Sequence, residues 1–155
     1  MDRTAKDGWQ NIDTIHRSIL NELLAKFDLH LEENEIRHLN LAWHRLMPWP
    51  DSVPGLNRLK TRYIVATLSN GNVSLLVDMA KNAGLPWDTV LSGELIVKYK
   101  PDPEVYRMAA RLLGAAYDET MLVAAHPPDL RANRPLDRRA NLTPGNKSRS
   151  PAHRG

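Results

Sequence analysis

The sequence predicts an α/β fold with a parallel sheet, preceded by a pair of helices. Three observations carry this prediction. A short apolar, β-branched run is followed at once by a polar turn and an amphipathic helix. The alternation of strand and helix then recurs along the chain, as in a doubly wound sheet. The first fifty residues instead show the three-to-four residue spacing of apolar side chains that is typical of helices.

The run from Tyr63 to Leu68 predicts a buried strand, and the residues to Gly84 predict a helix that ends there. Between them lie Ser69, Asn70, Gly71 and Asn72, and Asn72 is a plausible cap for the helix. Ligands of open α/β sheets bind outside the carboxyl ends of the strands, where Ser69 and Asn70 are expected. The alternative is that these two side chains only close the turn and cap the helix.

The N-terminal part predicts a helical hairpin. Apolar residues recur at helical spacing from Trp9 to Phe27 and again from about Glu32 to Leu46. The apolar faces of the two helices need a partner. Three prolines in MPWPDSVPG then mark the passage from the helical part to the α/β part, where residues 55–60 predict a short helix.

The α/β alternation continues after Gly84. A second strand is expected around residues 89–91, and a helix is expected after Asp102 and Pro103, which are good N-cap and first-turn residues. The run from Met121 to Ala125 predicts a third buried strand.

Composition narrows the functional classes. The chain has 155 residues, 42% of them hydrophobic, and no cysteine, which excludes disulfides and thiolate metal sites. No apolar run is long enough for a membrane span, and the first ten residues lack the apolar segment of a signal peptide. The expectation is a cytoplasmic protein without a membrane partner.

The charge is distributed unevenly. From Arg131 onward, seven basic residues and one acid give +6, so the total of +3 leaves −3 for the first 130 residues. Residues 131–155 contain few apolar side chains and are predicted to be a disordered basic tail. A nucleic-acid-binding arm is the less favoured reading, because the tail lacks aromatic residues for stacking on bases.

Three segments carry a family resemblance: AWHRLMPWPDSVPGLNRLKTRYIVATLSNGN, YKPDPEVY and MLVAAHPPDL. In this order and at this spacing they resemble type II (S)-2-haloacid dehalogenases of the haloacid dehalogenase superfamily, from Trp9 to Asp129. The resemblance implies a Rossmann-like core with a helical cap. It divides the chain into a partial cap at 1–50, a partial α/β core at 51–130 and the tail at 131–155.

The resemblance also implies roles for individual residues. Ser69 would hold the carboxylate of a short 2-halocarboxylate substrate, and Asn70 would lie near the leaving halide. Lys100 would pair with a nucleophilic aspartate, Tyr106 would lie close to the substrate, and Asp129 would support the lysine and the water step. Each has a plainer alternative: Lys100 as a solvated loop lysine, Tyr106 as a core residue and Asp129 as a helix cap.

Two departures from the family pattern occur near Asp129. Ala124 and His126 stand where some members carry serine and asparagine, and His126 could replace the asparagine as a polar partner. The superfamily's phosphatases place a metal-binding acid where this chain has Ala125, which offers no oxygen ligand to magnesium. The expectation is therefore no metal and no cofactor. The remaining histidines show no metal-ligand spacing and are expected to be surface or packing residues: His16, His30, His38, His44 and His153.

The nucleophile of the family belongs to an Asp-x-x-Gly-Thr type motif after an apolar strand. Asp2, Asp7 and Asp13 follow no such strand, so we expect no nucleophile in this chain and a core without its first and last strands. An inactive chain with a protein-binding role is the alternative function. Family members often dimerise through the cap, which makes a homodimer possible although part of the cap is expected to be missing.

Overall fold

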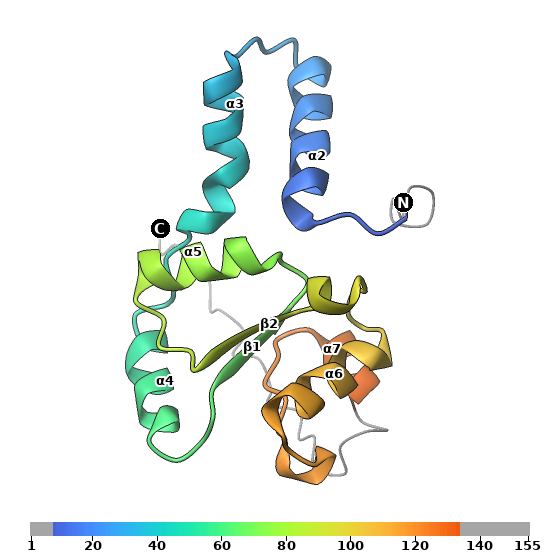
Figure 1. Cartoon of the computed structure of the whole chain (residues 1–155). Coiled ribbons are helices and arrows are strands. Elements are labelled where there is room, and N and C mark those ends of the chain that lie inside the picture. Colours follow the sequence, from blue (N-terminus) through green and yellow to red (C-terminus); the bar gives the residue numbers. More distant parts are fainter. Residues whose placement is uncertain (1–7, 134–155) are drawn as a thin grey trace, which may run out of the picture.

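The computed structural model describes residues 8–133 (Figure 1). A helical hairpin stands at one end of the molecule, and helix α5 lies between it and a small parallel sheet. The elements in chain order are α2 (Ile12–Lys26), α3 (Glu33–Asn40), η1 (Leu41–Arg45), α4 (Ser52–Lys60), β1 (Ala66–Ser69), α5 (Val73–Ala83), β2 (Thr89–Ser92), η2 (Gly93–Ile96), α6 (Pro103–Leu113), η3 (Tyr117–Glu119) and α7 (Pro127–Asn133).

The sheet pairs β1 with β2 in parallel, as the alternation of elements predicts. The register runs from Ala66 opposite Thr89 to Ser69 opposite Ser92, so two serines face each other at the carboxyl ends of the strands. β1 begins later than expected, and Tyr63 and Ile64 are 64% and 65% exposed. The chain before β1 is held instead by Asp88, whose carboxylate accepts the Val65 N–H at 2.9 Å.

The prediction of a third strand from Met121 to Ala125 is wrong. Residues 121–124 form no strand, and Met121 and Val123 are each 74% exposed. A strand requires a neighbour that takes its backbone hydrogen bonds, and none of the described residues provides one here. The apolar run identifies a segment suited to a sheet but cannot supply its partner.

The second helix of the hairpin is shorter than predicted. It is split into α3 and the 3₁₀ turn η1, and the backbone changes at Leu41. Glu32 and Glu35 form a capping box at its start, but no residue of α3 is buried. The 3₁₀ turn that follows carries the buried His44, and such turns are frequent at the C-terminal ends of helices.

The helix boundaries of the α/β part follow the sequence closely. Asp102 caps α6 by accepting the Glu104 N–H, and Gly84 and Gly114 end α5 and α6 with φ of 65°. Asn72 precedes α5 as expected, but its side chain does not cap the helix. The Val73 N–H donates instead to Glu94 Oε2 at 2.6 Å.

The hydrophobic core lies mainly in the α/β part. Helix α6 contributes four buried residues to it, whereas the hairpin contributes one. The buried apolar residues are Leu24, Leu75, Leu76, Leu91, Val105, Tyr106, Met108, Ala110 and Leu130.

Helix α7 continues to Asn133, three residues into the segment predicted to be a disordered tail. The remainder of that prediction, residues 134–155, lies outside the described residues. Within residues 8–133, no helix combines the length and apolarity needed to cross a membrane.

Candidate active site

Three of the residues singled out in the sequence meet between α6, α7 and the loop before α6. The Lys100 ammonium lies 3.1 Å from Asp129 Oδ2, and the Tyr106 hydroxyl donates to Asp129 Oδ1 at 2.8 Å. The side chains of Lys100 and Asp129 are only 16% and 14% exposed. We call these three residues the lysine cluster. A single carboxylate thus orients a lysine and a phenol that are 6 residues apart in the sequence.

The Tyr106 phenol keeps its proton in this environment. Tyr106 is 3% exposed. Burial, followed by the hydrogen bond to Asp129 and the charge of that carboxylate, raises the pKa of the phenol well above its ordinary value. Tyr106 therefore acts as a hydrogen-bond donor to Asp129. It is also a buried residue of α6, as the plainer alternative for Tyr106 expected.

The side chain of Asn70 holds the backbone of Lys100 at two points. Asn70 Oδ1 accepts the Lys100 N–H at 2.6 Å, and Asn70 Nδ2 donates to the Lys100 carbonyl at 3.2 Å. This pair of bonds ties the turn after β1 to the loop that carries the lysine. Asn70 is therefore engaged in positioning Lys100, with one amide hydrogen left for another acceptor.

Gly93 permits this close approach. A Cβ on Gly93 would lie 2.1 Å from the Lys98 carbonyl oxygen and 3.7 Å from Asn70 Oδ1. The Lys98 N–H also donates to the Gly93 carbonyl at 3.0 Å. Only a residue without a side chain lets the loop leading to Lys100 pack against the end of β2.

The turn after β1 is fixed by two serines. Ser69 Oγ accepts the Gly71 N–H at 3.0 Å. Ser92 is completely buried and donates its hydroxyl to the Gly71 carbonyl at 2.6 Å. Gly71 does not adopt a positive φ, so the turn does not need glycine for its backbone conformation. Its missing Cβ instead avoids a contact of 3.3 Å with Ser69 Oγ.

The structure does not bring His126 into this arrangement. The residue lies in the bend before α7 and is exposed, and no described residue forms a hydrogen bond with its side chain. Its carbonyl accepts the Asp129 N–H at 3.1 Å, which shapes the start of α7.

Ser92, Gly93 and Glu94 were missed by sequence reasoning. The signal that could have found them is their place directly after β2, at the same edge of the sheet as Ser69 and Asn70. The sequence suggested only a surface or packing role for His44. In the structure it is 6% exposed and hydrogen-bonded to two carboxylates.

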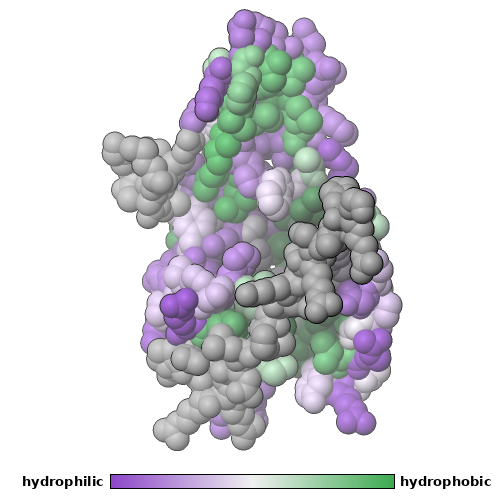
Figure 2. All heavy atoms as spheres, turned by 180° about the vertical axis from the view of Figure 1, so that it is seen from behind, coloured by the Kyte–Doolittle hydropathy of each residue, from purple (hydrophilic) through white to green (hydrophobic). Residues whose placement is uncertain are grey.

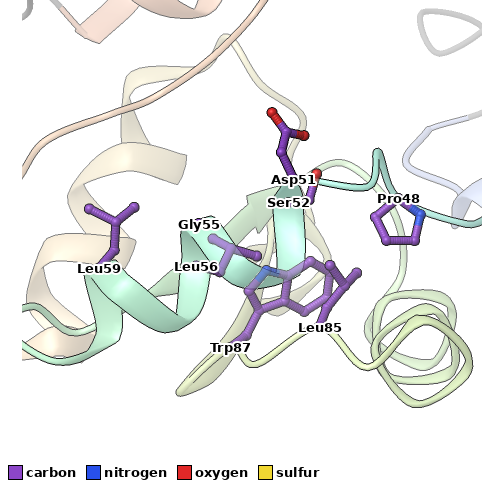
Figure 3. Close-up of a pocket in the computed structure, with 8 residues that line it drawn as sticks. All are labelled: Pro48, Asp51, Ser52, Gly55, Leu56, Leu59, Leu85 and Trp87. Atoms are coloured by element: carbon purple, nitrogen blue, oxygen red, sulfur yellow. The ribbon is translucent and has the colours of Figure 1, made fainter.

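A separate hollow of about 390 Å³ lies between α4 and the loop before β2 (Figure 3). Its lining is mostly apolar, with Asp51 and Ser52 at one end, and it contains no residue of the lysine cluster. The lining residues are Pro48, Asp51, Ser52, Gly55, Leu56, Leu59, Leu85 and Trp87. Elsewhere in residues 8–133, no three His, Asp or Glu side chains form a group that could hold a metal ion.

Comparison with known proteins shows the family to which the chain belongs. A family model described as haloacid dehalogenase-like hydrolase matches residues 3–136. The chain belongs to this family. Among curated relatives, (S)-2-haloacid dehalogenase 4A of Burkholderia cepacia is 37% identical over 127 residues, which cover 80% of this chain and 53% of the relative. The (S)-2-haloacid dehalogenase 1 of a Pseudomonas strain is 33% identical over 128 residues, which cover 80% and 54% of the two chains.

Solved structures show the same likeness. The crystal structure of an L-2-haloacid dehalogenase superposes with a TM-score of 0.83 at 47% identity, covering 86% of this chain and 59% of the other. The Xanthobacter autotrophicus L-2-haloacid dehalogenase with chloropropionic acid covalently bound gives a TM-score of 0.77 at 26% identity, covering 86% and 55%. The fold class predicted from the sequence is confirmed. The chain spans about half the length of the curated relatives it matches.

Proposed function

We propose that this chain carries the substrate-holding turn and the lysine cluster of a hydrolase that removes halide from short 2-haloalkanoic acids. The observation that supports this most directly is the two-point link between Asn70 and the Lys100 backbone. It ties the backbone of a lysine to a polar turn at the carboxyl end of a parallel strand, and a lysine there would suit an anionic substrate.

The proposed chemistry is nucleophilic substitution. A carboxylate attacks C2 of the haloacid, the carbon–halogen bond breaks, and halide leaves with the bonding electrons. Water then hydrolyses the ester, which gives a 2-hydroxy acid and regenerates the carboxylate. Ser69 would hold the substrate carboxylate, and the Lys100 ammonium would offset the negative charges of substrate and nucleophile. Asp129 and Tyr106 would keep the ammonium in place.

Asp13 is not suited to be the nucleophile. Its carboxylate is engaged by the His44 ring and by Asn72 Nδ2, and it lies on helix α2 and not at the end of a strand. Asp2 and Asp7 lie outside the described residues. No aspartate of the chain stands in an Asp-x-x-Gly-Thr motif, so we expect the purified chain to bind a haloacid without releasing halide.

The binding test uses (S)-2-chloropropionate and the purified chain. Titration followed by ¹H–¹⁵N NMR should shift the amide signals of residues 69–71 and 100. Lys100→Ala should abolish these shifts, whereas Lys98→Ala is a matched control because Lys98 pairs with Asp102 at the surface. Shifts scattered over other parts of the chain, or none at all, would count against the proposal.

The chemistry requires a second test. Residues 9–130 are placed in the corresponding segment of the Burkholderia cepacia relative, and chloride release is measured with and without Lys100→Ala. A folded chimera that releases no chloride would contradict the proposal. Chloride release by the isolated chain would show instead that the nucleophile lies within it.

A protein-binding role is the second candidate function, and one observation favours it. β1 has a single strand neighbour among the described residues, and the side chains of Tyr63, Ile64, Met121 and Val123 are exposed. Such an edge can accept a strand from another protein. A full-length relative mixed with the chain should then co-elute with it. Separate elution of the two proteins at micromolar concentration would contradict this protein-binding role. The same elution profile also shows whether the chain forms a homodimer.

A further inference from the structure

The helical hairpin is attached to the α/β part through a buried histidine. His44 Nδ1 lies 2.8 Å from Asp78 Oδ2 on α5, and His44 Nε2 lies 3.1 Å from both carboxylate oxygens of Asp13 on α2. A carboxylate can only accept hydrogen bonds, so both ring nitrogens must carry hydrogen for both contacts to form. The geometry is therefore that of an imidazolium.

The charged groups around the ring are few. Asp13 and His16 face it from α2, and Asp78 faces it from α5. The guanidinium of Arg45, on the same 3₁₀ turn, is instead bound by the carbonyls of His38 and Leu41.

His16 does not compete for the proton. Its ring stacks on Trp43 at 5.2 Å, and burial, partly opposed by Asp13 and reinforced by His44, lowers its pKa.

Helices α2 and α3 of the hairpin bury few apolar side chains. α3 buries no residue and α2 buries only Leu24. Asn72 Nδ2 extends the polar contact by donating to Asp13 Oδ2 at 2.8 Å. A second tie joins Trp9 and Gln10 to Tyr99, through stacked rings and the Gln10 N–H, which donates to the Tyr99 hydroxyl at 3.2 Å.

We propose that His44 is a pH-sensitive latch: the protonated ring ties the hairpin to helix α5, and loss of its proton releases the hairpin at that point. The tie at Tyr99 keeps the start of the hairpin in place. This inference goes beyond the proposed function and does not depend on it.

The direction of the pH dependence follows from linkage. Burial alone lowers the pKa of His44, but the hydrogen bonds to Asp78 and Asp13 and the charges of these carboxylates outweigh burial, and the pKa is raised above its ordinary value of 6.5. A raised pKa means that protonation stabilises the docked state. The stabilisation is fully present below pH 6.5 and is lost as the pH rises through the higher value.

The test measures the distance between the hairpin and α6. The chain has no cysteine, so His30→Cys at the hairpin tip and Arg111→Cys on α6, both at exposed positions, accept a pair of fluorophores or spin labels. We expect a narrow distance distribution at pH 5.5 and a broader, longer one at pH 9, with a midpoint above 6.5. His44→Gln should give the broad distribution at both pH values. His38→Gln is the control, because His38 is an exposed histidine on α3, and it should keep the response.

Two outcomes would overturn the latch: a distance distribution that is the same at pH 5.5 and 9, or a pH response that persists in His44→Gln. If His44→Gln does not fold, NMR of the ring signals in the unmodified chain decides. A His44 titration midpoint at or below 6.5 would then contradict the proposal.

Discussion

Helices α6 and α3 have the same kind of amphipathic pattern but different surroundings. Helix α6 buries Val105, Tyr106, Met108 and Ala110, and it carries part of the lysine cluster. Helix α3 buries nothing, and Figure 2 shows a hydrophobic strip along the hairpin to which it belongs. The exposed apolar side chains of the hairpin include Leu23, Phe27, Leu39, Trp43 and Leu46. An amphipathic pattern therefore reports that a face is apolar, but not that something covers it.

The two regions also differ in how they are fastened. The lysine cluster includes Tyr106, one of the buried residues of α6, whereas the hairpin is fastened by His44 with its two carboxylates and by the contacts of Trp9 and Gln10 with Tyr99. Apolar packing is insensitive to pH near neutrality, and a histidine–carboxylate contact is not. Three pairs of substitutions test this difference between the two regions.

The largest difference is expected in the core. Met108 is 3% exposed, and Met108→Ala should lower the free energy of unfolding by about 2–5 kcal/mol, because it leaves a cavity. Leu39 on α3 is 45% exposed, and Leu39→Ala should change it by no more than about 0.5 kcal/mol. Urea denaturation followed by circular dichroism measures both. Similar losses would mean that the hairpin face is covered in solution.

The next difference concerns two ion pairs. Asp129→Asn removes the charge that faces Lys100 in a mostly buried site and should cost about 1.5–3 kcal/mol, the range for hydrogen bonds to charged groups. Glu33→Gln weakens the pair with Arg17, in which the Glu33 side chain is 74% exposed, and should leave the denaturation midpoint almost unchanged. A larger loss of stability in Glu33→Gln than in Asp129→Asn would mean that the lysine cluster does not stabilise the fold.

The third comparison is between two glycines. Gly93→Ala places a Cβ against the Lys98 carbonyl and should destabilise the chain by about 1–3 kcal/mol. Gly55 lies inside α4 with its nearest side-chain atom at 3.8 Å, so Gly55→Ala should stabilise by about 0.5–1 kcal/mol. NMR of the Lys100 amide should show a shift only in Gly93→Ala. An unshifted Lys100 amide in Gly93→Ala would mean that the loop reaches Asn70 without packing closely against residue 93.

Much of the site could be predicted because its residues follow strands or cap helices. Ser69, Asn70 and Asp102 occupy positions that the local pattern defines, and the structure has them there. Lys100 and Asp129 were singled out by resemblance, but their contact at 3.1 Å depends on how the loop before α6 and the first turn of α7 pack together. The position of Asn72 before α5 could be predicted from the sequence. The hydrogen bond that its side chain donates to Asp13 could not, because Asp13 is distant in the chain.

The sequence by itself determined the succession of helices and strands from α4 to α6, the ends of α5 and α6 and the polar turn after β1, because these depend on residues close together in the chain. Tertiary structure decided the rest. Whether Met121 to Ala125 becomes a strand depends on a neighbour that can take its backbone hydrogen bonds. The charge of His44 depends on two carboxylates 31 and 34 residues away in the chain, which only the folded molecule brings to the ring.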